Sequence, residues 1–340
     1  MKLDIIVPHY NEPWDVLEKF FGILDLQRGV NFSDFRVIVV NDGAEYHLDD
    51  RHFSSRPYEV KQIEIEHGGV SAARNAGIDA AEAEWITFCD CDDMYTNIYS
   101  MRDLIEVLPA PGFDMMWTPF IAEDRDPKGE IYMHLRDDMN FVFVHGKLWR
   151  RQFLIDNNIR FDTDIRFSED SEFCAIADCY LEMKRTGRID TPQPSYAWLY
   201  RQGSVTTTPG RWVESRLNLF VRHKKVNEVF RQRMPYHRYC AQIGRTIADA
   251  YHTLNRETLC DELLEMKKEV RQLYLDHKKE FQRIDSETMK EIMKISRCEN
   301  VELERPENLR DIGNFRGHII EEISIYQWLD NLEHENEVNA

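Results

Sequence analysis

Three carboxylates follow an apolar run in the segment WITFCDCDDMY, residues 85–95. Asp90, Asp92 and Asp93 lie within four positions, where like charges repel one another. In an extended chain alternate side chains share a face, so we expect Asp90 and Asp92 to converge on a cation. Carboxylate oxygens suit Mg²⁺ or Mn²⁺, and Mg²⁺ takes one or two carboxylates plus substrate phosphates. The alternative is a solvated turn after a strand, because Asp is common in turns.

A second acid, Asp42, follows an apolar run in the segment VVNDGAE, residues 39–45. Asn-Asp-Gly is also a hairpin signal, but the polar residues that follow offer no partner strand. The carboxyl ends of parallel strands form a ligand crevice at one edge of a sheet. We therefore expect Asp42 to lie near Asp90 and Asp92, where it can accept a hydrogen bond from a base or ribose.

Two glycines precede a predicted helix in HGGVSAARNAG, residues 67–77. Glycine lets backbone approach a ligand closely, and a helix N-terminus favours anions, so Arg74 could reach a phosphate from the first turns. The spacing matches neither a dinucleotide fingerprint nor a P-loop. Nothing in this segment therefore argues for nicotinamide cofactors or ATP hydrolysis.

Two further acids, Glu169 and Asp170, stand at the start of a predicted helix in RFSEDSEFCAIADCYLEMK, residues 166–184. A structural reading is available, because Ser168 is a good N-cap residue and acids in a first turn complement the helix dipole. The functional reading makes one of the two acids a general base, which must be ionised and within reach of the proton that it removes.

The elements that position these residues alternate between strands and helices in the first part of the chain. We expect strands at 3–8, 35–40, 60–65 and 85–90 and helices within 13–29 and 69–84, which together predict a mostly parallel sheet covered on both faces. Further strands are predicted within 113–124, 131–136 and 195–201, with a turn at Pro127 and Gly129 between the first two and a helix at 171–185.

From about residue 212 the chain is predicted to be helical. Apolar residues recur at helical spacing in two stripes, which include Ile243, Ile247, Leu263 and Met266. Core packing is the simplest reading of these stripes, and a dimer interface or an acceptor platform are the alternatives. The tail at 331–340 reads as disordered.

Composition limits the classes of partner. The chain has 340 residues, 42% of them hydrophobic, and a formal charge of −18, which argues against non-specific binding to nucleic acid or an anionic membrane. We see neither a signal peptide nor a membrane-spanning segment, and we expect a cytoplasmic protein. The seven cysteines are scattered and odd in number, which favours reduced thiols.

Taken together, IIVPHYNE, VVNDGA, GGVSAARNAG, FCDCDD and SEDSEF closely resemble, in order and spacing, the family 2 glycosyltransferases of GT-A fold. The resemblance extends over about the first 205 residues, through the segments 144–162 and 200–206. It implies a GT-A domain at 1–211 with a mostly parallel central sheet, followed by a helical C-terminal region at 212–340. That region would serve acceptor specificity or homo-oligomerisation.

The resemblance also implies a nucleotide-sugar donor, commonly a UDP-sugar, and an inverting transfer to an acceptor hydroxyl in glycan or polysaccharide synthesis. It places a Mn²⁺ or Mg²⁺ ion on the acids of the DxD motif, Asp90 and Asp92, and gives Asp90 a contact with ribose as well. Asp170 matches the catalytic base and Glu169 its neighbour. The remaining donor-site residues are Pro8, Tyr10, Glu12, Asp42 and Arg74, and Arg201 could join Arg74 at the leaving group. Two positions depart from the family pattern, Cys91 within the DxD motif and His9 in the first loop.

Two rival functions remain. A degenerate glycosyltransferase-like scaffold would have lost the DxD acids or the base, and both are present. A sugar nucleotidyltransferase would carry a glycine-rich loop with Arg and Lys after its first strand, which VPHYNEPWD lacks. Polysaccharides, lipid-linked sugars, protein side chains and small metabolites all remain open as acceptors, and the donor sugar does not follow from the residues.

Overall fold

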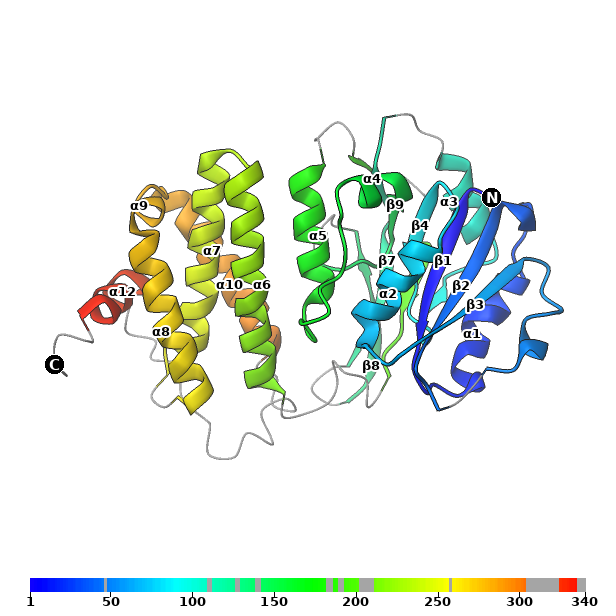
Figure 1. Cartoon of the computed structure of the whole chain (residues 1–340), viewed down its shortest axis with the longest axis horizontal. Helices are drawn as coiled ribbons and strands as arrows, with labels where there is room; N and C mark the ends of the chain where they lie inside the picture. The colour runs from blue at the N-terminus through cyan, green and yellow to red at the C-terminus, as the bar shows by residue number, and fades with distance from the viewer. Residues whose placement is uncertain are drawn as a thin grey trace. The chain divides into compact units, whose positions relative to one another are not determined.

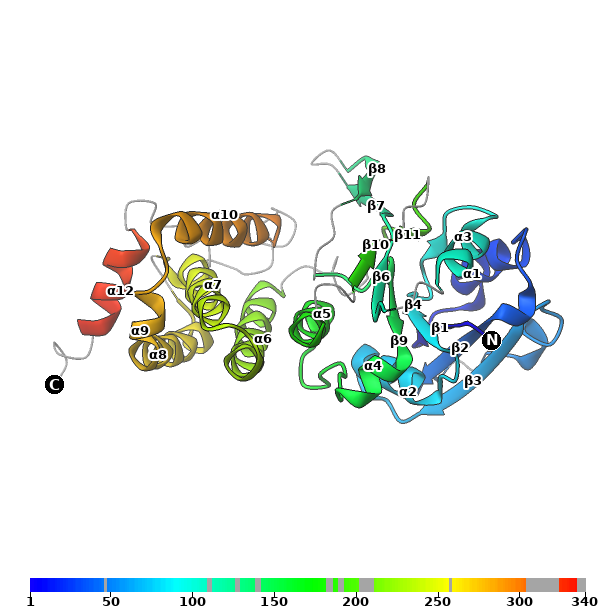
Figure 2. The ribbon, with the colours of Figure 1, turned by 90° about the horizontal axis from the view of Figure 1, so that it is seen from above.

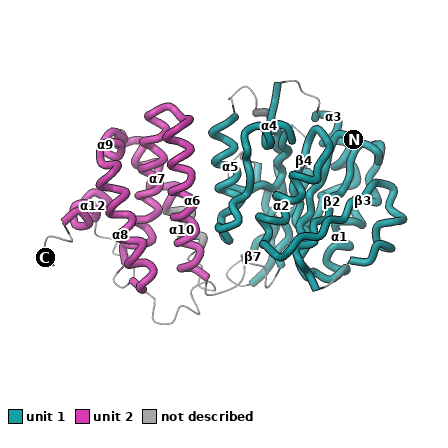
Figure 3. The backbone as a smooth tube through the Cα atoms, viewed as in Figure 1, with its two compact units in different colours: residues 1–201 teal, residues 202–340 magenta. Residues whose placement is uncertain are grey.

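The computed structural model describes residues 1–45, 48–108, 112–125, 129–137, 142–181, 186–188, 193–201, 211–256, 259–303 and 324–334 (Figure 1). The chain divides into two compact units, Met1–Arg201 and Gln202–Ala340 (Figure 3). The boundary predicted at residue 211 differs from this division by residues 202–211, of which 202–210 lie outside the described residues.

A seven-stranded sheet with the order β10-β6-β9-β4-β1-β2-β3 forms the centre of the first unit. Parallel pairs join β1 to β2 and β4, β2 to β3, and β6 to β10, whereas β9 runs antiparallel to β4 and β6. The predicted mostly parallel sheet is therefore confirmed. Its strands are β1 (Leu3–His9), β2 (Phe35–Asp42), β3 (Glu59–Ile65), β4 (Trp85–Phe88), β6 (Met115–Trp117), β9 (Lys147–Arg150) and β10 (Thr186–Arg188).

Helices cover both faces of this sheet, as Figure 2 shows. On β1, Leu3, Ile5 and Val7 point to one face, where they pack with α1 (Trp14–Asp25) and α3 (Ser100–Val107). Ile6 points to the other face, where it packs with α2 (Gly69–Ala80), α4 (Arg151–Asp156) and α5 (Glu169–Tyr180). The alternation of side chains along a strand thus creates two apolar cores on one sheet.

A smaller sheet with the order β5-β11-β7-β8 completes the first unit. Its strands are β5 (Met94–Tyr95), β7 (Phe120–Arg125), β8 (Ile131–Arg136) and β11 (Tyr196–Trp198). β7 and β8, between which a turn was predicted, pair in an antiparallel arrangement, and Gly129 between them has φ +90°. Pro127 lies outside the described residues. Because β11 pairs with β5, residues 196–198 lie beside the chain that leaves the acidic segment.

Two local expectations in the first unit were wrong. The strand predicted at 85–90 ends at Phe88, and the chain then turns, with the amide of Asp93 donating to the carbonyl of Asp90 at 3.0 Å. The alternation of an extended chain therefore does not apply to the acids. The second is the cap: Ser168 makes no side-chain capping bond and has a left-handed backbone with φ +66°, although the helix does begin at Glu169, with the two acids in its first turn as predicted.

The described part of the second unit is helical, as expected. Its core combines residues from successive helices, including Ile243, Ile247, Leu263 and Met266. The helices are α6 (Trp212–Arg233), α7 (Tyr236–Leu254), α8 (Asp261–Asp276), α9 (Lys278–Phe281), α10 (Ser286–Leu303) and α12 (Ile325–His334). None of the described helices is both long and apolar enough to cross a bilayer.

The disorder predicted for the tail was wrong for residues 331–334, which form the last turn of α12. The helix has an apolar face, because Trp328, Leu329 and Leu332 are buried in the core of the second unit. Polar residues between and after these three made the segment read as disordered. Residues 335–340 lie outside the described residues.

Candidate active site

The carboxyl ends of β4, β1 and β2 meet at one edge of the large sheet, because these strands are parallel neighbours. The loop that begins at His9, the acid Asp42 and the turn that carries the acidic segment leave from this edge. Open parallel sheets bind ligands at such an edge. The topology therefore collects the predicted site residues, and side-chain contacts decide how they are grouped.

Arg74, on α2, is the centre of the first group. Its guanidinium, only 3% exposed, donates to Oδ1 of Asp90 at 2.9 Å, to Oδ1 of Asp170 at 2.6 Å and to Oε1 of Glu169 at 3.1 Å. Burial alone would lower the pKa of Arg74, but the three carboxylates around it raise that pKa overall. Burial likewise opposes ionisation of Asp90, and Arg74 nevertheless lowers the pKa of its carboxyl.

Glu169 and Asp170 form the first turn of α5 and face the same guanidinium. Burial, and then the neighbouring charge of Asp170, raise the pKa of Glu169 to about 7. The amide of Val144 donates to Oδ2 of Asp170 at 3.4 Å. The predicted base and its neighbour therefore share one cation with the first acid of the DxD motif.

Arg201 holds a second group. Its Nε donates to Oδ2 of Asp92 at 2.6 Å and its Nη2 to Oε1 of Glu12 at 3.3 Å. The other carboxylate oxygen of Glu12 accepts from the amide of Tyr10 at 2.8 Å. Burial, and then the charge of Asp90, raise the pKa of Asp92. Asp90 and Asp92 are thus held by different arginines and do not share one cationic side chain.

Asp42 and Tyr10 belong to a third group, around His67. Asp42 accepts from the amides of Gly68 at 2.7 Å and Gly69 at 2.9 Å, and its Oδ2 lies 3.0 Å from Nδ1 of His67. The ring of Tyr10 stacks on His67 with centroids 4.3 Å apart. The glycine amides predicted to approach a ligand therefore bind a carboxylate of the chain itself, while Tyr10 as a residue remains 45% exposed.

The other two first-loop residues take structural positions. Pro8 lies within β1 opposite Val40 of β2. His9, whose role the sequence leaves open, is buried, and its Nε2 lies 2.8 Å from the carbonyl oxygen of Glu12. This contact joins the two ends of the loop that carries Tyr10 and Glu12.

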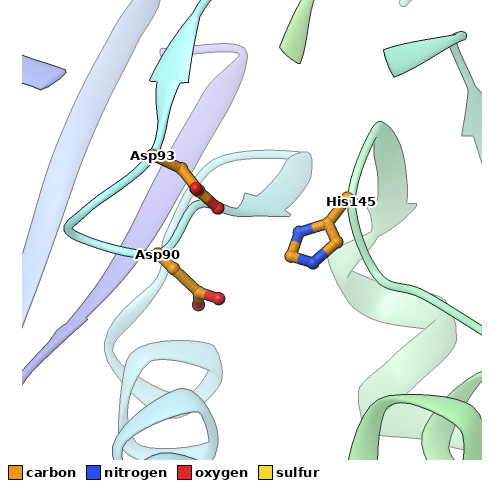
Figure 4. A group of neighbouring side chains, drawn as sticks. All are labelled: Asp90, Asp93 and His145. Carbon is orange, nitrogen blue, oxygen red and sulfur yellow. The ribbon is translucent and has the colours of Figure 1, made fainter. Parts of the chain in front are cut away.

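A cluster that the sequence did not predict brings Asp90 and Asp93 together with His145, whose ring is directed toward the two carboxylates (Figure 4). One ligand atom from each of the three residues lies within 4.8 Å of the others. Asp93 accepts from the amide of Leu199 at 2.8 Å and from the hydroxyl of Tyr196. Burial raises the pKa of Asp93 and lowers that of His145.

Comparison with known proteins connects this site to one family. Residues 4–170 match the family described as Glycosyl transferase family 2, a range that runs from β1 to Asp170. Residues 4–170 belong to this family. The structure is similar to a crystal structure of TarS from Staphylococcus aureus, and this similarity shows the shared GT-A fold. The TM-score is 0.58 at 15% identity, and the match covers 91% of this chain and 55% of that one.

Two sequence relatives of this chain are glycosyltransferases by name. It is 29% identical over 228 residues to the uncharacterized glycosyltransferase EpsJ of Bacillus subtilis, covering 61% of this chain and 63% of EpsJ. It is 23% identical over 209 residues to the poly(ribitol-phosphate) beta-N-acetylglucosaminyltransferase TarS, covering 58% of this chain and 35% of TarS. The chain therefore spans less than two thirds of the length of either relative. A structure of TarS 1–349 in complex with UDP-GlcNAc matches at a TM-score of 0.50 and 16% identity, covering 88% of this chain and 92% of that one.

Sequence reasoning thus found most polar residues at this edge of the family 2 domain and missed His145. Asp93 was visible as part of the acidic run, but its inward direction depends on the turn after Phe88. His145 stands in the segment 144–162, which the resemblance includes without giving His145 a role, and the local signal beside it is the glycine that follows. Gly146 has φ +67°, and a Cβ there would lie 2.5 Å from the carbonyl oxygen of Thr118.

Proposed function

We propose that this chain is an inverting glycosyltransferase that moves a sugar from a nucleotide-sugar donor, a UDP-sugar, to a hydroxyl of a glycan or related acceptor. The observation that supports this best is the position of Arg74, which contacts the predicted base Asp170 and the donor-site acid Asp90 with a single guanidinium. The UDP-GlcNAc complex of the similar TarS fragment supports a uridine donor.

The proposed chemistry follows from how charge develops during sugar transfer. The acceptor oxygen must lose a proton as it attacks, and Asp170 is the group that receives it. Nη1 of Arg74 holds this carboxylate in place by an ion pair at 2.6 Å. Negative charge grows on the departing diphosphate, and fixed cations at that place lower the barrier. Arg74 and Arg201 are the guanidiniums at this edge that can supply them.

The acids of the DxD motif fit a divalent cation, Mn²⁺ or Mg²⁺, by their donor atoms. The contact with Arg74 uses Oδ1 of Asp90, and the contact with Arg201 uses Oδ2 of Asp92, so each carboxylate keeps one oxygen outside these ion pairs. Hard oxygen ligands are those that these ions prefer. When bound by Asp90 and Asp92, the ion would neutralise charge on the diphosphate.

The nucleoside would lie over the first loop. Tyr10 offers an exposed aromatic face for a base, next to His67 and the carboxylate of Asp42. Pro8 and Glu12 hold the two ends of the loop that carries this ring. The second unit has its own helical core, and we assign it acceptor specificity or homo-oligomerisation.

Thermal unfolding with UDP, GDP, CDP and dTDP, each with and without Mn²⁺, tests the donor assignment. A ligand present at about a hundred times its Kd stabilises a fold by about 2.7 kcal/mol. We expect a metal-dependent shift with UDP that the Asp92→Asn variant weakens. The matched control is Asp164→Asn, because Asp164 is an exposed acid of the same unit. A chain that responds to none of the four nucleotides would be a glycosyltransferase-like scaffold instead.

The base is tested separately from the donor site. In Asp170→Asn the amide cannot accept the proton, while its oxygen can still accept from Arg74. We expect the shift with UDP to persist and sugar transfer from UDP-GlcNAc or UDP-glucose to fall by roughly 10²- to 10⁴-fold. Product formation is followed by release of UDP and by the anomeric configuration of the product in NMR spectra. Unchanged turnover in this variant would remove Asp170 from the mechanism.

A further inference from the structure

We propose that two copies of this chain form a dimer through β8, with the β8 strands of the two copies paired antiparallel across a two-fold axis. The inference goes beyond the proposed function and does not depend on it. It assigns the contact between copies to the first unit. Of the two roles given to the second unit, it therefore favours acceptor specificity.

β8 is an edge strand of the small sheet (Figure 2). Among the described residues only β7 pairs with it, in an unbroken register of six residue pairs. The outer edge of β8 therefore presents backbone N–H and C=O groups to which no described strand is paired. The opposite edge of the sheet is β5, which has only two residues. In its described part the small sheet thus has one edge that is long enough to pair with another strand.

One face of β8 carries a row of exposed apolar side chains. Ile131, Met133 and Leu135 alternate along the strand, so they point to the same face of the sheet. Their exposed fractions are 52%, 64% and 53%. Single apolar residues on a surface need no explanation, but a contiguous apolar surface is typical of an interaction site. This row therefore indicates a face of the sheet that another element covers.

β8 also lacks the features that keep edge strands from pairing. Natural edges are protected by lysine or proline, by a bulge, or by an element that covers them. The segment IYMHLR, residues 131–136, contains neither lysine nor proline, and its register with β7 shows no bulge. A strand from a second copy would bind the outer backbone groups and cover the apolar row.

The sequence of β8 is complementary to itself when one strand is reversed. With the two-fold axis at Met133, this residue is opposite Met133 of the second copy, and Ile131 is opposite Leu135 of the second copy. Side chains that are directly opposite in an antiparallel pair share a face and have Cβ atoms about 4.5–5.5 Å apart. The apolar row of one copy would therefore pack against the row of the other.

The opposite face of the strand adds charge complementarity in the same register. Glu130, which precedes β8, is opposite Arg136 of the second copy, and the two-fold axis makes this contact twice. Tyr132 is opposite His134, and these two rings already lie 5.8 Å apart, centroid to centroid, within one strand. Opposite charges and aromatic rings are favourable pairs across neighbouring strands. Both faces of β8 thus match a second copy of the same strand.

Neighbouring registers fit less well. With the axis at His134, Ile131 would be opposite Asp137 of the second copy, an apolar side chain against a carboxylate. With the axis at Tyr132, Glu130 would be opposite His134 and would lose its contact with Arg136. The register centred on Met133 is therefore the one that we assign.

This arrangement predicts a dimer and no larger assembly. A two-fold contact uses the same surface on both copies, so it is closed. An open fibre needs a second surface that can pair, and the other described edge of the small sheet is the two-residue strand β5.

Sedimentation velocity of the full-length chain over a wide range of concentration is the first test. We expect a species of twice the mass of the chain at high concentration. Arg136→Glu would place like charges opposite each other at both ends of the interface, and we expect the dimer Kd to rise about 10-fold. Adding Glu130→Arg to this variant restores opposite charges, so the Kd should return toward the wild-type value. The control is Arg51→Glu, because the side chain of Arg51 is 90% exposed elsewhere in the first unit.

Oxidative cross-linking with copper phenanthroline then tests the register. A disulfide requires Cα atoms within about 7 Å, and residue 133 is opposite its own copy, so Met133→Cys should form a covalent dimer. The two copies of residue 131 would be roughly 14 Å apart, so Ile131→Cys should not link to itself but should link to Leu135→Cys in a mixture. Leu26→Cys is the control, because Leu26 is also 52% exposed. The wild-type chain gives the background from the native cysteines.

Three outcomes would overturn the inference. The first is a chain that stays monomeric at every concentration. The second is a dimer that Arg136→Glu leaves unchanged and that Met133→Cys does not link, which would place the contact elsewhere, for example on the helical second unit. The third is a monomer that sediments with phosphatidylcholine vesicles and loses this binding in Met133→Asp, which would assign the apolar row to a lipid surface. A melting shift with UDP, retained in each variant, shows that the variant is folded and tests the proposed function separately.

Discussion

Nη1 of Arg74 lies 2.6 Å from Oδ1 of Asp170, and Nη2 of the same guanidinium lies 2.9 Å from Oδ1 of Asp90. One buried cation thus connects the proposed base for the acceptor with an acid of the donor site. An arginine can do this because its planar fork presents several donors in fixed directions. A change at either carboxylate therefore alters the environment of the other.

Arg74→Lys tests this coupling. A lysine keeps the positive charge but offers one ammonium group, which cannot occupy the positions of both Nη1 and Nη2. We expect kcat/KM for sugar transfer to fall by roughly 10²- to 10³-fold, the size of effect seen when one preorganised donor is removed. Arg160→Lys is the control. Arg160 forms an ion pair with Asp79, with 2.9 Å between Nη2 and Oδ1, and this pair is not part of the Arg74 network. Equal activity of the two variants would show that charge alone is sufficient at position 74.

The pH dependence of transfer tests the role of Glu169, whose pKa burial and the charge of Asp170 raise to about 7. Below pH 7 Glu169 is mostly neutral, and Arg74 is shared by Asp90 and Asp170. Above pH 7 Glu169 is ionised and competes with Asp170 for Nη1 of Arg74, which contacts both carboxylates, so the carboxylate of Asp170 is held less tightly by the guanidinium. We therefore expect kcat to rise with pH through about 7 in the wild-type chain. In Glu169→Gln this rise should disappear, because glutamine does not titrate.

Rates measured from pH 5.5 to 8.5 decide the matter, with Asp164→Asn as the control, since it should keep the wild-type profile. A rise of the same size and midpoint in Glu169→Gln would assign the titration to a different group.

The mostly parallel sheet and the identity of most site residues followed from local patterns. Alternation of apolar runs and helical spacing predicted the sheet, and the parallel arrangement predicted that Asp42 and Asp90 leave from one edge. The positions of Asp90 and Arg74 in neighbouring elements made their proximity foreseeable.

Long-range pairing was beyond such reasoning. The partner of Asp92 is Arg201, which the second sheet brings to the site through the pairing of β11 with β5. The alternation of side chains expected along a strand cannot reveal that the chain turns after Phe88. The turn is formed by one backbone hydrogen bond, from the amide of Asp93 to the carbonyl of Asp90. The same turn directs Asp93 toward His145, and no local pattern connects those two residues.

Acid stability tests a buried network in the second unit. Nε2 of His223 lies 2.6 Å from Oδ2 of Asp249, whose other oxygen accepts from Ser296, and all three are almost fully buried. Burial, and then the charge of Arg222, lower the pKa of His223 to about 4. In the unfolded chain histidine titrates near 6.5, so the unfolded state binds more protons between these values. The contribution of His223 to the free energy of unfolding is therefore fully present above pH 6.5. About 3 kcal/mol of that free energy is lost as the pH falls from 6.5 toward 4.

Hydrogen exchange of α7 amides between pH 7.0 and 4.5 measures this loss after correction for intrinsic rates. We expect His223→Gln to have a smaller dependence on pH than the wild-type chain, and His237→Gln to retain it. An unchanged slope in His223→Gln would mean that another group controls the acid stability of the second unit.

Two glycines in the middle of helices provide a matched test of packing in the first unit. Gly77, on α2, lies against β1, and a Cβ there would overlap Cγ2 of Ile6, whereas a Cβ at Gly22 on α1 would meet no atom within 4 Å. Replacing an unhindered helical glycine by alanine stabilises a helix by up to about 1 kcal/mol. Forcing extra volume into a packed core costs about 1–3 kcal/mol. We therefore expect opposite changes in the free energy of unfolding measured in urea, a gain for Gly22→Ala and a loss for Gly77→Ala.

Because α2 carries Arg74, Gly77→Ala should also weaken the UDP-dependent melting shift, while Gly22→Ala should leave it unchanged. Stabilisation by both substitutions would contradict the close contact between α2 and β1.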